Sequence, residues 1–423
     1  MNKVPSVETI SEPAKKIKVF AEAQVVVVGG GPGGVSAAIA AAREGADTIL
    51  IERYGHLGGM ASGGLVLMMD QWPAGLCYEW FERLSALEGG IRDISKTKEP
   101  GLSKHSWMMD PELLKCILND MTLKSKVRLF LHSWGASAIT EGNGVKGVIF
   151  ESKQGRQAIL GEVIIDCTGD GDIFASAGAE FDGLVDQQLR SSQIASVYRI
   201  GNIDFEKFSD FRANEPDKWQ KMRDEFDAIA GFHMGPVPAS RPDVMWMNSF
   251  IRGRSTLKVE DLTFIETTIR KAMLPVHEYF KKNVPGFEKA YLYDSASQIG
   301  TRGSRRLIGE HTLTKKELDE HKTFADAIGV FPKGAAPNAP RNVPLPYGCL
   351  VPVKVDGLLV AGRNFSADPV VNNMFNVIPH CVVMGQVAGT AAALAAKNKV
   401  APRKVDLKAL RTRLSAQGTE MPK

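Results

Sequence analysis

The segment "VVVVGGGPGGVSAAIAAAREGADTILIE", residues 25–52, constrains the fold more than any other part of the sequence. Its four valines do not alternate with polar residues, which is typical of a parallel strand buried on both faces. The glycines Gly29, Gly31 and Gly34 follow in the spacing G-x-G-x-x-G, and an alanine-rich helix and a second strand, 48–51, come next. This order predicts a dinucleotide-binding βαβ unit.

Each conserved feature of such a unit has a physical role that this segment can fill. Gly29 allows the tight turn, Gly31 leaves room for a pyrophosphate, and Gly34 lets the helix pack closely on the strand. The anion then lies at the helix N-terminus. Glu52, at the end of the second strand, is placed to accept a hydrogen bond from a ribose 2′-hydroxyl and would repel a 2′-phosphate. The sequence therefore predicts either FAD or NAD.

Later segments favour FAD over NAD. A third parallel strand is predicted at 127–131, followed by an antiparallel meander at about 134–161 and a buried strand at 163–166. From residue 183 to about 345 the regular alternation of strand and helix is lost. A buried strand and a glycine turn then appear again in "VDGLLVAGRNFSADP". A flavin ring extends away from the first glycine turn, so that later segments must build its site. The return is therefore typical of an FAD-binding domain.

The predicted fold class is α/β: a Rossmann-type FAD-binding domain with an inserted β-meander, plus a mixed α+β substrate domain. A chain of 423 residues exceeds the size at which a single core stops growing. The predicted divisions are an N-terminal extension, 1–20; a first FAD-binding part, 21–182, with cap elements at about 65–110; a substrate domain, 183–345; and a returning FAD-binding segment, 346–423.

Composition narrows the function classes. A hydrophobic content of 44% and a net charge of +4 are ordinary for a soluble protein and do not indicate a nucleic-acid partner. The sequence shows no stretch of about 18 apolar residues and no signal peptide, which predicts no membrane association. The five widely spaced cysteines predict a reducing, cytoplasmic compartment and no metal site. We expect a small-molecule substrate as partner and leave a homo-oligomer open.

Seven further motifs make the sequence similar to a known family. They are "GGGPGGVSAAIAAAREGA", "ERYGHLGGMAS", "IDCTGDGDIFASAGAEF", "QIGTRGSRRLIGEHTLT", "LPYGCLVP", "DGLLVAGRNFS" and "GQVAGTAAALA". With them the chain resembles the FAD-dependent oxidoreductases with a glutathione-reductase-like flavin fold, in a broad branch whose motifs are specific for FAD but not for substrate. The resemblance covers residues from about 20 to 418.

Carried over by position, the resemblance implies a set of FAD-binding residues. These are Gly29, Gly31, Gly33 and Gly34 at the pyrophosphate, Glu52 at the ribose, Ala136 near the adenine, and Arg53, Gly58, Gly59, Met60, Gly169, Gly362 and Arg363. Pro32 in the glycine loop and Pro379 at the start of the last long helix complete the predicted set. The chain departs from the branch pattern at Gly303, Gly348 and Asn376, positions expected to face the substrate.

The candidate catalytic residues lie between and after these motifs. Arg302 and Arg305 belong to the densest basic cluster, and a guanidinium fork suits a substrate carboxylate. A structural alternative for each arginine of the cluster, and above all for Arg306, is an ion pair with Glu310 or another acid. His380, beside the expected flavin, is the first candidate for proton transfer, with a buried structural role as the alternative.

Four other side chains are weaker candidates. His56 could contact FAD or be covalently attached to it. Cys381 invites a redox role, but a lone cysteine on a helix is more often a small core residue. Asp70 and Gln71 are polar candidates after an apolar run.

The function predicted from these residues is hydride abstraction from a small polar, carboxylate-bearing substrate, with electrons passed to oxygen or an external acceptor. The alternatives are reduction of an activated C=C bond by the reduced flavin, as in fumarate-reductase-like proteins, and a flavin-binding protein without turnover. The chain contains no second G-x-G-x-x-G, which argues against a pyridine-nucleotide reductase.

Overall fold

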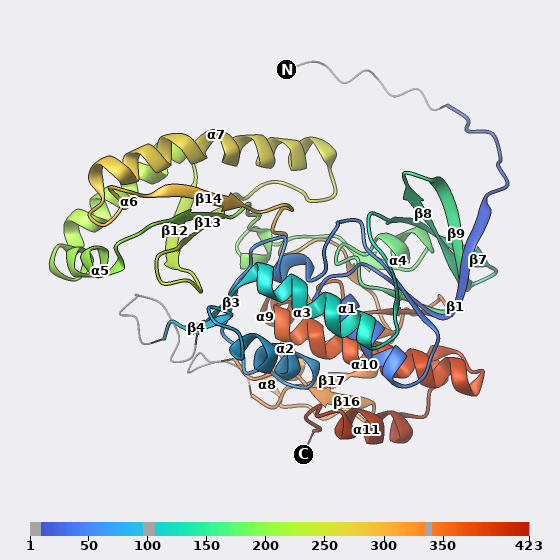
Figure 1. Ribbon diagram of the computed structural model, residues 1–423. Coiled ribbons are helices and arrows are strands. Elements are labelled where there is room, and N and C mark those ends of the chain that lie inside the picture. Colours follow the sequence, from blue (N-terminus) through green and yellow to red (C-terminus); the bar gives the residue numbers. More distant parts are fainter. Residues whose placement is uncertain (1–9, 96–105, 335–340, 423) are drawn as a thin grey trace.

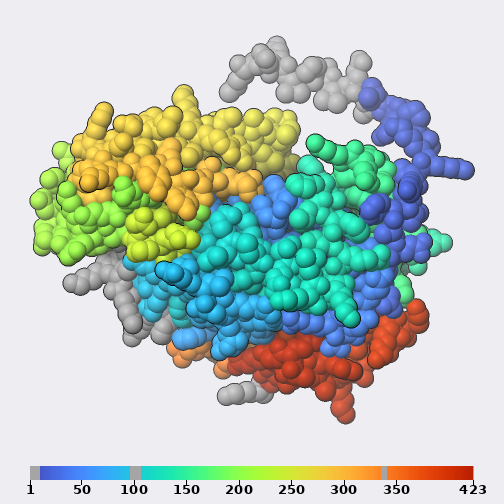
Figure 2. Space-filling model, viewed as in Figure 1, coloured from blue at the N-terminus to red at the C-terminus, as the bar shows by residue number. Residues whose placement is uncertain are grey.

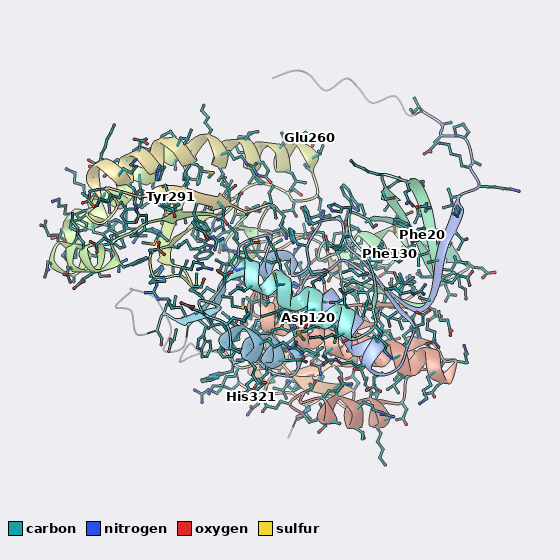
Figure 3. The ribbon with its side chains drawn as sticks, viewed as in Figure 1. Phe20, Asp120, Phe130, Glu260, Tyr291 and His321 are labelled. Atoms are coloured by element: carbon teal, nitrogen blue, oxygen red, sulfur yellow. The ribbon has the colours of Figure 1, made fainter. Side chains whose placement is uncertain are left out.

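A central sheet with five parallel strands organises the computed structural model, which describes residues 10–95, 106–334 and 341–422 (Figure 1). Val25–Val28 lie at its middle, are at most 2% exposed, and pair with parallel strands on both sides. The order is β6-β2-β1-β9-β18. The strands are β1 (Lys18–Val28), β2 (Thr48–Ile51), β6 (Arg128–Phe130), β9 (Gly155–Asp166) and β18 (Leu358–Val360). Phe20 of β1 packs edge-on against Phe130 of β6, 5.0 Å between ring centres (Figure 3).

The antiparallel meander extends the same sheet. Strand β8 (Gly144–Ser152) pairs with the first half of β9, and β7 (Trp134–Glu141) pairs with β8 at the edge of the sheet. The sequence predicts a separate buried strand at 163–166, but the structure has one continuous strand through Asp166. The reason is that β9 changes neighbours along its length: Gly147 of β8 faces Leu160, whereas Leu358 of β18 faces Ile164.

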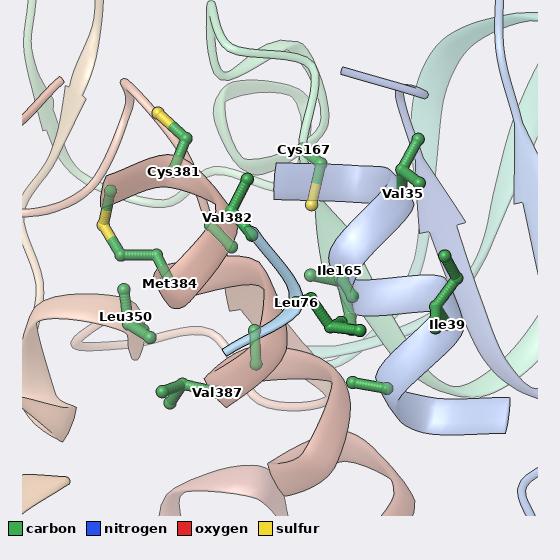
Figure 4. Packing of buried hydrophobic residues seen from close by; sticks show 14 of the residues in the cluster. Val35, Ile39, Leu76, Ile165, Cys167, Leu350, Cys381, Val382, Met384 and Val387 are labelled. Carbon is green, nitrogen blue, oxygen red and sulfur yellow. The ribbon is translucent and has the colours of Figure 1, made fainter. Parts of the chain in front are cut away.

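Two helices rich in small residues cover the sheet next to the glycine loop. They are α1 (Pro32–Arg43) and α10 (Ile378–Asn398), whose facing residues are buried (Figure 4). A Cβ atom on Gly385 would come within 2.0 Å of the Gly33 carbonyl oxygen, and one on Gly389 within 2.1 Å of the Ala37 carbonyl oxygen. Glycine is therefore required for this close approach.

Helix α10 also bears on the expectation about membranes. It is long and apolar enough to cross a bilayer, with a mean hydropathy of 1.4, so the expectation that no such stretch exists is wrong for this segment. The whole apolar window is buried inside the protein, which explains its composition by packing.

A second lobe is built from residues within 183–345 and is seen in green and yellow in Figures 1 and 2. Its antiparallel sheet has the order β12-β13-β11-β14. Phe208, Phe226, Phe280 and Phe287 form part of its separate core. The strands are β11 (Tyr198–Gly201), β12 (His233–Pro238), β13 (Met245–Phe250) and β14 (Tyr291–Ser295), and the helices are α5 (Phe205–Asn214), α6 (Pro216–Ala230) and α7 (Val259–Asn283).

The remaining elements are shorter sheets and further helices. A three-stranded sheet, β3 (Met68–Met69), β5 (Trp107–Met109) and β4 (Ile91–Asp93), lies within the predicted cap, of which 96–105 lie outside the described residues, as do 1–9 of the predicted extension. The remaining helices are α2 (Leu76–Ser85), α3 (Pro111–Lys124), α4 (Asp172–Ser176), α8 (Lys315–Asp319), α9 (Pro369–Phe375) and α11 (Leu407–Ala416). The remaining strands pair as β10 (Phe181–Asp182) with β15 (Arg306–Leu307) and β16 (Ala327–Val330) with β17 (Pro344–Pro346).

Candidate functional site

A cavity of about 440 Å³ lies where the carboxyl ends of the parallel strands meet the second lobe. Strands β1, β2 and β9 end at its wall, as expected for a ligand site of a doubly wound sheet. Eleven of the fifteen residues predicted to bind the cofactor line it: Gly29, Gly31, Pro32, Gly33, Glu52, Arg53, Gly59, Met60, Gly169, Gly362 and Arg363. The structure thus brings together segments up to 334 residues apart.

The glycine loop has the geometry of an anion cradle. Gly29 has φ of 99°, and a Cβ there would lie 2.5 Å from the Cys167 carbonyl oxygen. A Cβ on Gly31 would meet no protein atom within 4 Å and would project into open space. Gly31 also caps α1, whose first turn has neither a side-chain cap nor an acidic residue. The first amides of α1 are therefore free to bind a phosphate.

Glu52 closes the cavity at the end of β2. Its carboxylate accepts hydrogen bonds from the Gly30 amide at 2.5 Å and the Tyr54 amide at 2.8 Å. Burial raises the pKa of this carboxyl, while the two amide donors act in the opposite direction. The side chain therefore shapes the glycine loop as well as facing the cavity.

Four of the predicted cofactor residues do not line this cavity. Gly34 packs against the sheet, since a Cβ there would lie 1.7 Å from the Gly29 carbonyl oxygen. Gly58 turns the following loop with φ of 100°. Pro379 is buried in the first turn of α10. Ala136 lines a neighbouring hollow of about 620 Å³ that shares Trp134 with the cavity.

Two partly buried arginines line the second-lobe side of the cavity, and no described acidic side chain pairs with either one. Arg190 donates from Nη2 to Asn376 Oδ1 at 2.6 Å, and Arg302 donates from Nη1 to Gln193 Oε1 at 2.8 Å. The Arg302 guanidinium also lies 5.0 Å from the ring centre of Phe250. Burial and the nearby charge of Arg190 lower the pKa of Arg302 to about 10. This pair forms a positively charged wall.

The other arginines of the predicted cluster are engaged elsewhere. Arg305 pairs with Asp172 at 3.0 Å and lines the outer hollow, not the main cavity. Arg306 pairs with Asp182 and is buried, as the structural alternative predicts, although its partner is not Glu310. The geometry therefore supports a binding role for Arg302 but does not support one for Arg305.

His380 does not line the cavity, which argues against the predicted proton transfer. Its Nε2–H donates to the Pro332 carbonyl oxygen at 2.8 Å, and the ring packs edge-on against Phe331 and Phe375. Burial lowers the pKa of this imidazole to about 4. The first turn of α10 rotates the side chain into the core, so a structural role fits better.

Of the four weaker candidates, three line the cavity and one does not. Asp70, Gln71 and Cys381 line the cavity, and burial raises the pKa of the Cys381 thiol to about 12, which leaves it unreactive. His56 does not line the cavity; it stacks on Tyr54 and lies 3.0 Å from Ser297 Oγ. Covalent attachment of FAD to His56 is therefore not favoured.

Of the three departures from the branch pattern, only Asn376 faces the cavity. Gly303 packs against Ser191, and Gly348 against His311, where a Cβ would come within 2.9 Å in each case. The expectation that all three positions face the substrate is thus wrong for the two glycines.

Sequence reasoning missed Arg190, Asn248 and Thr301, all of which line the cavity. Arg190 stands in "DQQLRSSQ", which has neither periodicity nor a motif. Thr301 directly precedes the predicted residue Arg302. This adjacency is the only feature of the sequence that could have indicated a place for Thr301 in the site. No group of three metal-ligating side chains occurs in the part of the chain that the structure describes.

The fold and this cavity define a dinucleotide-binding flavoprotein, and comparison with known proteins specifies the family. The profile described as FAD dependent oxidoreductase matches residues 24–414, so the chain belongs to that family. The protein is an FAD-dependent oxidoreductase. No curated protein sequence matches it significantly.

Solved structures with a similar fold have low sequence identity. A geranylgeranyl bacteriochlorophyll reductase-like protein from Thermoplasma acidophilum has a TM-score of 0.50 at 15% identity, covering 95% of this chain and 84% of its own. A myxobacterial chondrochloren halogenase has a TM-score of 0.50 at 12% identity, covering 92% and 78%. The p-nitrophenol 4-monooxygenase of Pseudomonas putida has 0.49 at 11%, covering 94% and 85%. These likenesses concern the fold alone.

Proposed function

We propose that this enzyme takes a hydride from a small, carboxylate-bearing substrate and passes the electrons to oxygen or an external acceptor. The observation that carries the proposal is the pair Arg190 and Arg302, two partly buried cations that line the cavity without a described acidic partner. A buried charge is unfavourable unless it is paired. An anionic substrate group would supply the missing charge.

The residues at the sheet end of the cavity fit FAD. Gly31 would admit the pyrophosphate, the first amides of α1 would bind it, and Glu52 would accept from the adenosine ribose. The first turn of α10 also has no side-chain cap, and Val377 and Ile378 line the cavity. Its amides would favour negative charge on the flavin ring. When bound, FAD supplies the hydride acceptor.

The domain division predicted from the sequence suits this arrangement. Segments 21–182 and 346–423 contribute the glycine loop and α10, whereas 183–345 contributes the arginines. We therefore assign cofactor binding to the first two segments, in a glutathione-reductase-like arrangement, and substrate binding to the third.

Arg302 and Arg190 would orient the substrate by binding its carboxylate. A guanidinium presents a planar fork of donors, and each arginine already uses part of its fork to hold its own position. The remaining donors can bind substrate oxygens with little loss of side-chain freedom. This pre-organisation lowers KM without any proton transfer by the arginines.

One observation favours the second candidate, reduction of an activated C=C bond. The pKa of Arg302 is lowered to about 10, which makes this side chain a better proton donor than an ordinary arginine. In that direction a proton from Arg302 and a hydride from the reduced cofactor would add across the double bond.

The deciding experiment compares one arginine variant with a matched control variant. A panel of acids is first screened by anaerobic bleaching of the oxidised enzyme, and a panel of enoates by reoxidation of the reduced enzyme. For the best acid, Arg302→Lys should raise KM by about tenfold or more, since a charge-assisted hydrogen bond contributes about 1.5–3 kcal/mol. The neutral amide of that acid should be almost unaffected.

Arg305→Lys provides the control, because Arg305 does not line the main cavity and is held in an ion pair with Asp172. It should leave both KM values near those of the wild type. An equal loss for the acid and its amide in Arg302→Lys contradicts the carboxylate role. A loss confined to kcat with an enoate substrate favours the reductase.

A further inference from the structure

Strand β13 forms part of the cavity wall opposite the glycine loop. Alternate residues of a strand point to the same face, and Trp246 and Asn248 both line the cavity. Phe250 is the next residue on this face, and the Arg302 guanidinium lies over its ring. Positions two apart on a strand are separated by about 7 Å. Asn248 and Arg302 therefore lie on the same wall of the cavity.

The side chains at this wall have hydrogen-bonding capacity that the described chain does not use. Asn248 Oδ1 and Thr301 Oγ1 are both buried without a hydrogen-bond partner among the described residues. Buried polar atoms are nearly always satisfied, so each unpaired atom in a cavity indicates a missing ligand group. An amide oxygen only accepts hydrogen bonds, and the ligand must therefore carry a donor here.

The nearby charges indicate which donor it is. Arg190 and Arg302 are both positive, and burial strengthens their repulsion of another cation. A substrate ammonium group would meet this repulsion, whereas a neutral hydroxyl would not. Two arginines and an unpaired acceptor on one cavity wall are the groups that would bind a carboxylate with a hydroxyl on the adjoining carbon.

We propose that Asn248 is a specificity-determining residue whose side-chain oxygen accepts a hydrogen bond from a substrate hydroxyl, so that the substrate class is the 2-hydroxycarboxylic acids. The inference rests on the proposed function, because Arg302 binds the carboxylate of the same molecule. Asn248 holds the hydroxyl while the arginines hold the acid. Thr301 lies beside Arg302 and can bind the same hydroxyl or a carboxylate oxygen.

Tertiary 2-hydroxy acids test this hydrogen bond by binding alone. They cannot be oxidised, because the carbon that bears the hydroxyl has no hydrogen to leave as a hydride. Three isosteric pairs differ only by hydroxyl or methyl: 2-hydroxyisobutyrate and pivalate, citramalate and 2,2-dimethylsuccinate, and 2-hydroxy-2-phenylpropionate and 2-methyl-2-phenylpropionate. Binding to the FAD-loaded enzyme is measured by titration calorimetry. In at least one pair the hydroxy acid should bind about tenfold more tightly, the effect of one hydrogen bond to an otherwise unpaired acceptor. The amino analogue 2-aminoisobutyrate should bind more weakly than 2-hydroxyisobutyrate.

Asn248→Leu should reduce the affinity for the preferred hydroxy acid to that for its methyl isostere. Asn283→Leu, the same replacement on α7 outside the cavity, should retain the preference. Flavin absorbance and thermal unfolding verify the fold of both variants, and the comparison within each pair on the unmodified enzyme needs no variant.

The proposal is overturned if the unmodified enzyme does not distinguish the members of any pair, if the amino analogue binds more tightly, or if Asn248→Leu keeps the preference. Binding of the acids without a hydroxyl preference rejects the role of Asn248 and leaves the carboxylate site intact. Failure of every acid to bind rejects the carboxylate site and this inference together.

Discussion

Asn376 Oδ1 accepts a hydrogen bond of 2.6 Å from Arg190 Nη2, which fixes one of the two arginines on the second-lobe side of the cavity. The same amide donates from Nδ2 to the Arg302 carbonyl oxygen at 2.8 Å. One neutral side chain thus positions both arginines without neutralising either of them. A carboxylate at this position would keep the contact with Arg190 but cancel its charge.

Asn376→Asp is therefore expected to raise KM for a carboxylate substrate by about tenfold, through loss of one charge-assisted interaction. The neutral amide analogue should lose less affinity, because only the lost donation from Asn376 Nδ2 to the Arg302 carbonyl oxygen affects both compounds alike. Steady-state kinetics on both compounds would check this. A fall in kcat with unchanged KM would show that Arg190 acts in the chemical step.

The role of the glycine loop can be tested by adding a side chain at a position where the protein alone has room for it but the complex with FAD does not. A Cβ on Gly31 meets no protein atom, so Gly31→Val should fold and lack flavin absorbance. Gly235→Val is the matched control, since Gly235 also has no neighbour within 4 Å and lies in β12 outside the cavity. Folded, fully yellow Gly31→Val protein would remove this loop from the cofactor site.

His380 should control stability and not catalysis. Its pKa is about 4 in the folded protein, below the ordinary 6.5. Between these values the unfolded chain binds more protons, so the contribution of His380 to stability is complete above pH 6.5 and is lost as pH falls towards 4. Its full size is on the order of 3 kcal/mol.

His380→Gln can still donate to the Pro332 carbonyl but does not titrate. Compared with the wild type, its free energy of unfolding should therefore fall less between pH 6.5 and 4, as measured by denaturant unfolding. The pH profile of kcat should be the same in both proteins. A changed profile would restore His380 as a proton-transfer residue.

Local pattern was sufficient to predict the parts of the site that depend on consecutive residues. The valines of β1, the turn at Gly29 and the acid at Glu52 each follow from strand, turn and helix chemistry within one short segment. Val28, Gly29 and Glu52 all line the cavity, in agreement with that interpretation.

Residues whose roles depend on distant partners could not be found in this way. Arg190 is positioned by Asn376, 186 residues later in the sequence, and nothing local distinguishes it from other loop arginines. Arg305 lies three residues from Arg302 and has the same chemistry, but it forms an ion pair with Asp172, whereas no described acid pairs with Arg302. For His380, α10 is buried on all sides, so its sequence has no polar face from which the side-chain direction could be inferred.

The contact between α1 and α10 allows a final prediction that separates stability from cofactor binding. Gly385 and Gly389 lie one turn apart on α10, and a Cβ on either would overlap the backbone of α1. Overpacking of this kind costs about 1–3 kcal/mol, so Gly385→Ala and Gly389→Ala should both lower the unfolding temperature.

The two variants should differ in their affinity for FAD, because they press on different residues of α1. Gly385→Ala displaces Gly33, which lines the cavity, whereas Gly389→Ala displaces Ala37, one turn further from the glycine loop and outside the cavity. We expect weaker FAD binding for Gly385→Ala and near-normal binding for Gly389→Ala at equal loss of stability. Flavin fluorescence titration of the apoproteins, with thermal unfolding in parallel, measures both quantities. Equal affinities in the two variants would mean that α10 does not control the geometry of the glycine loop.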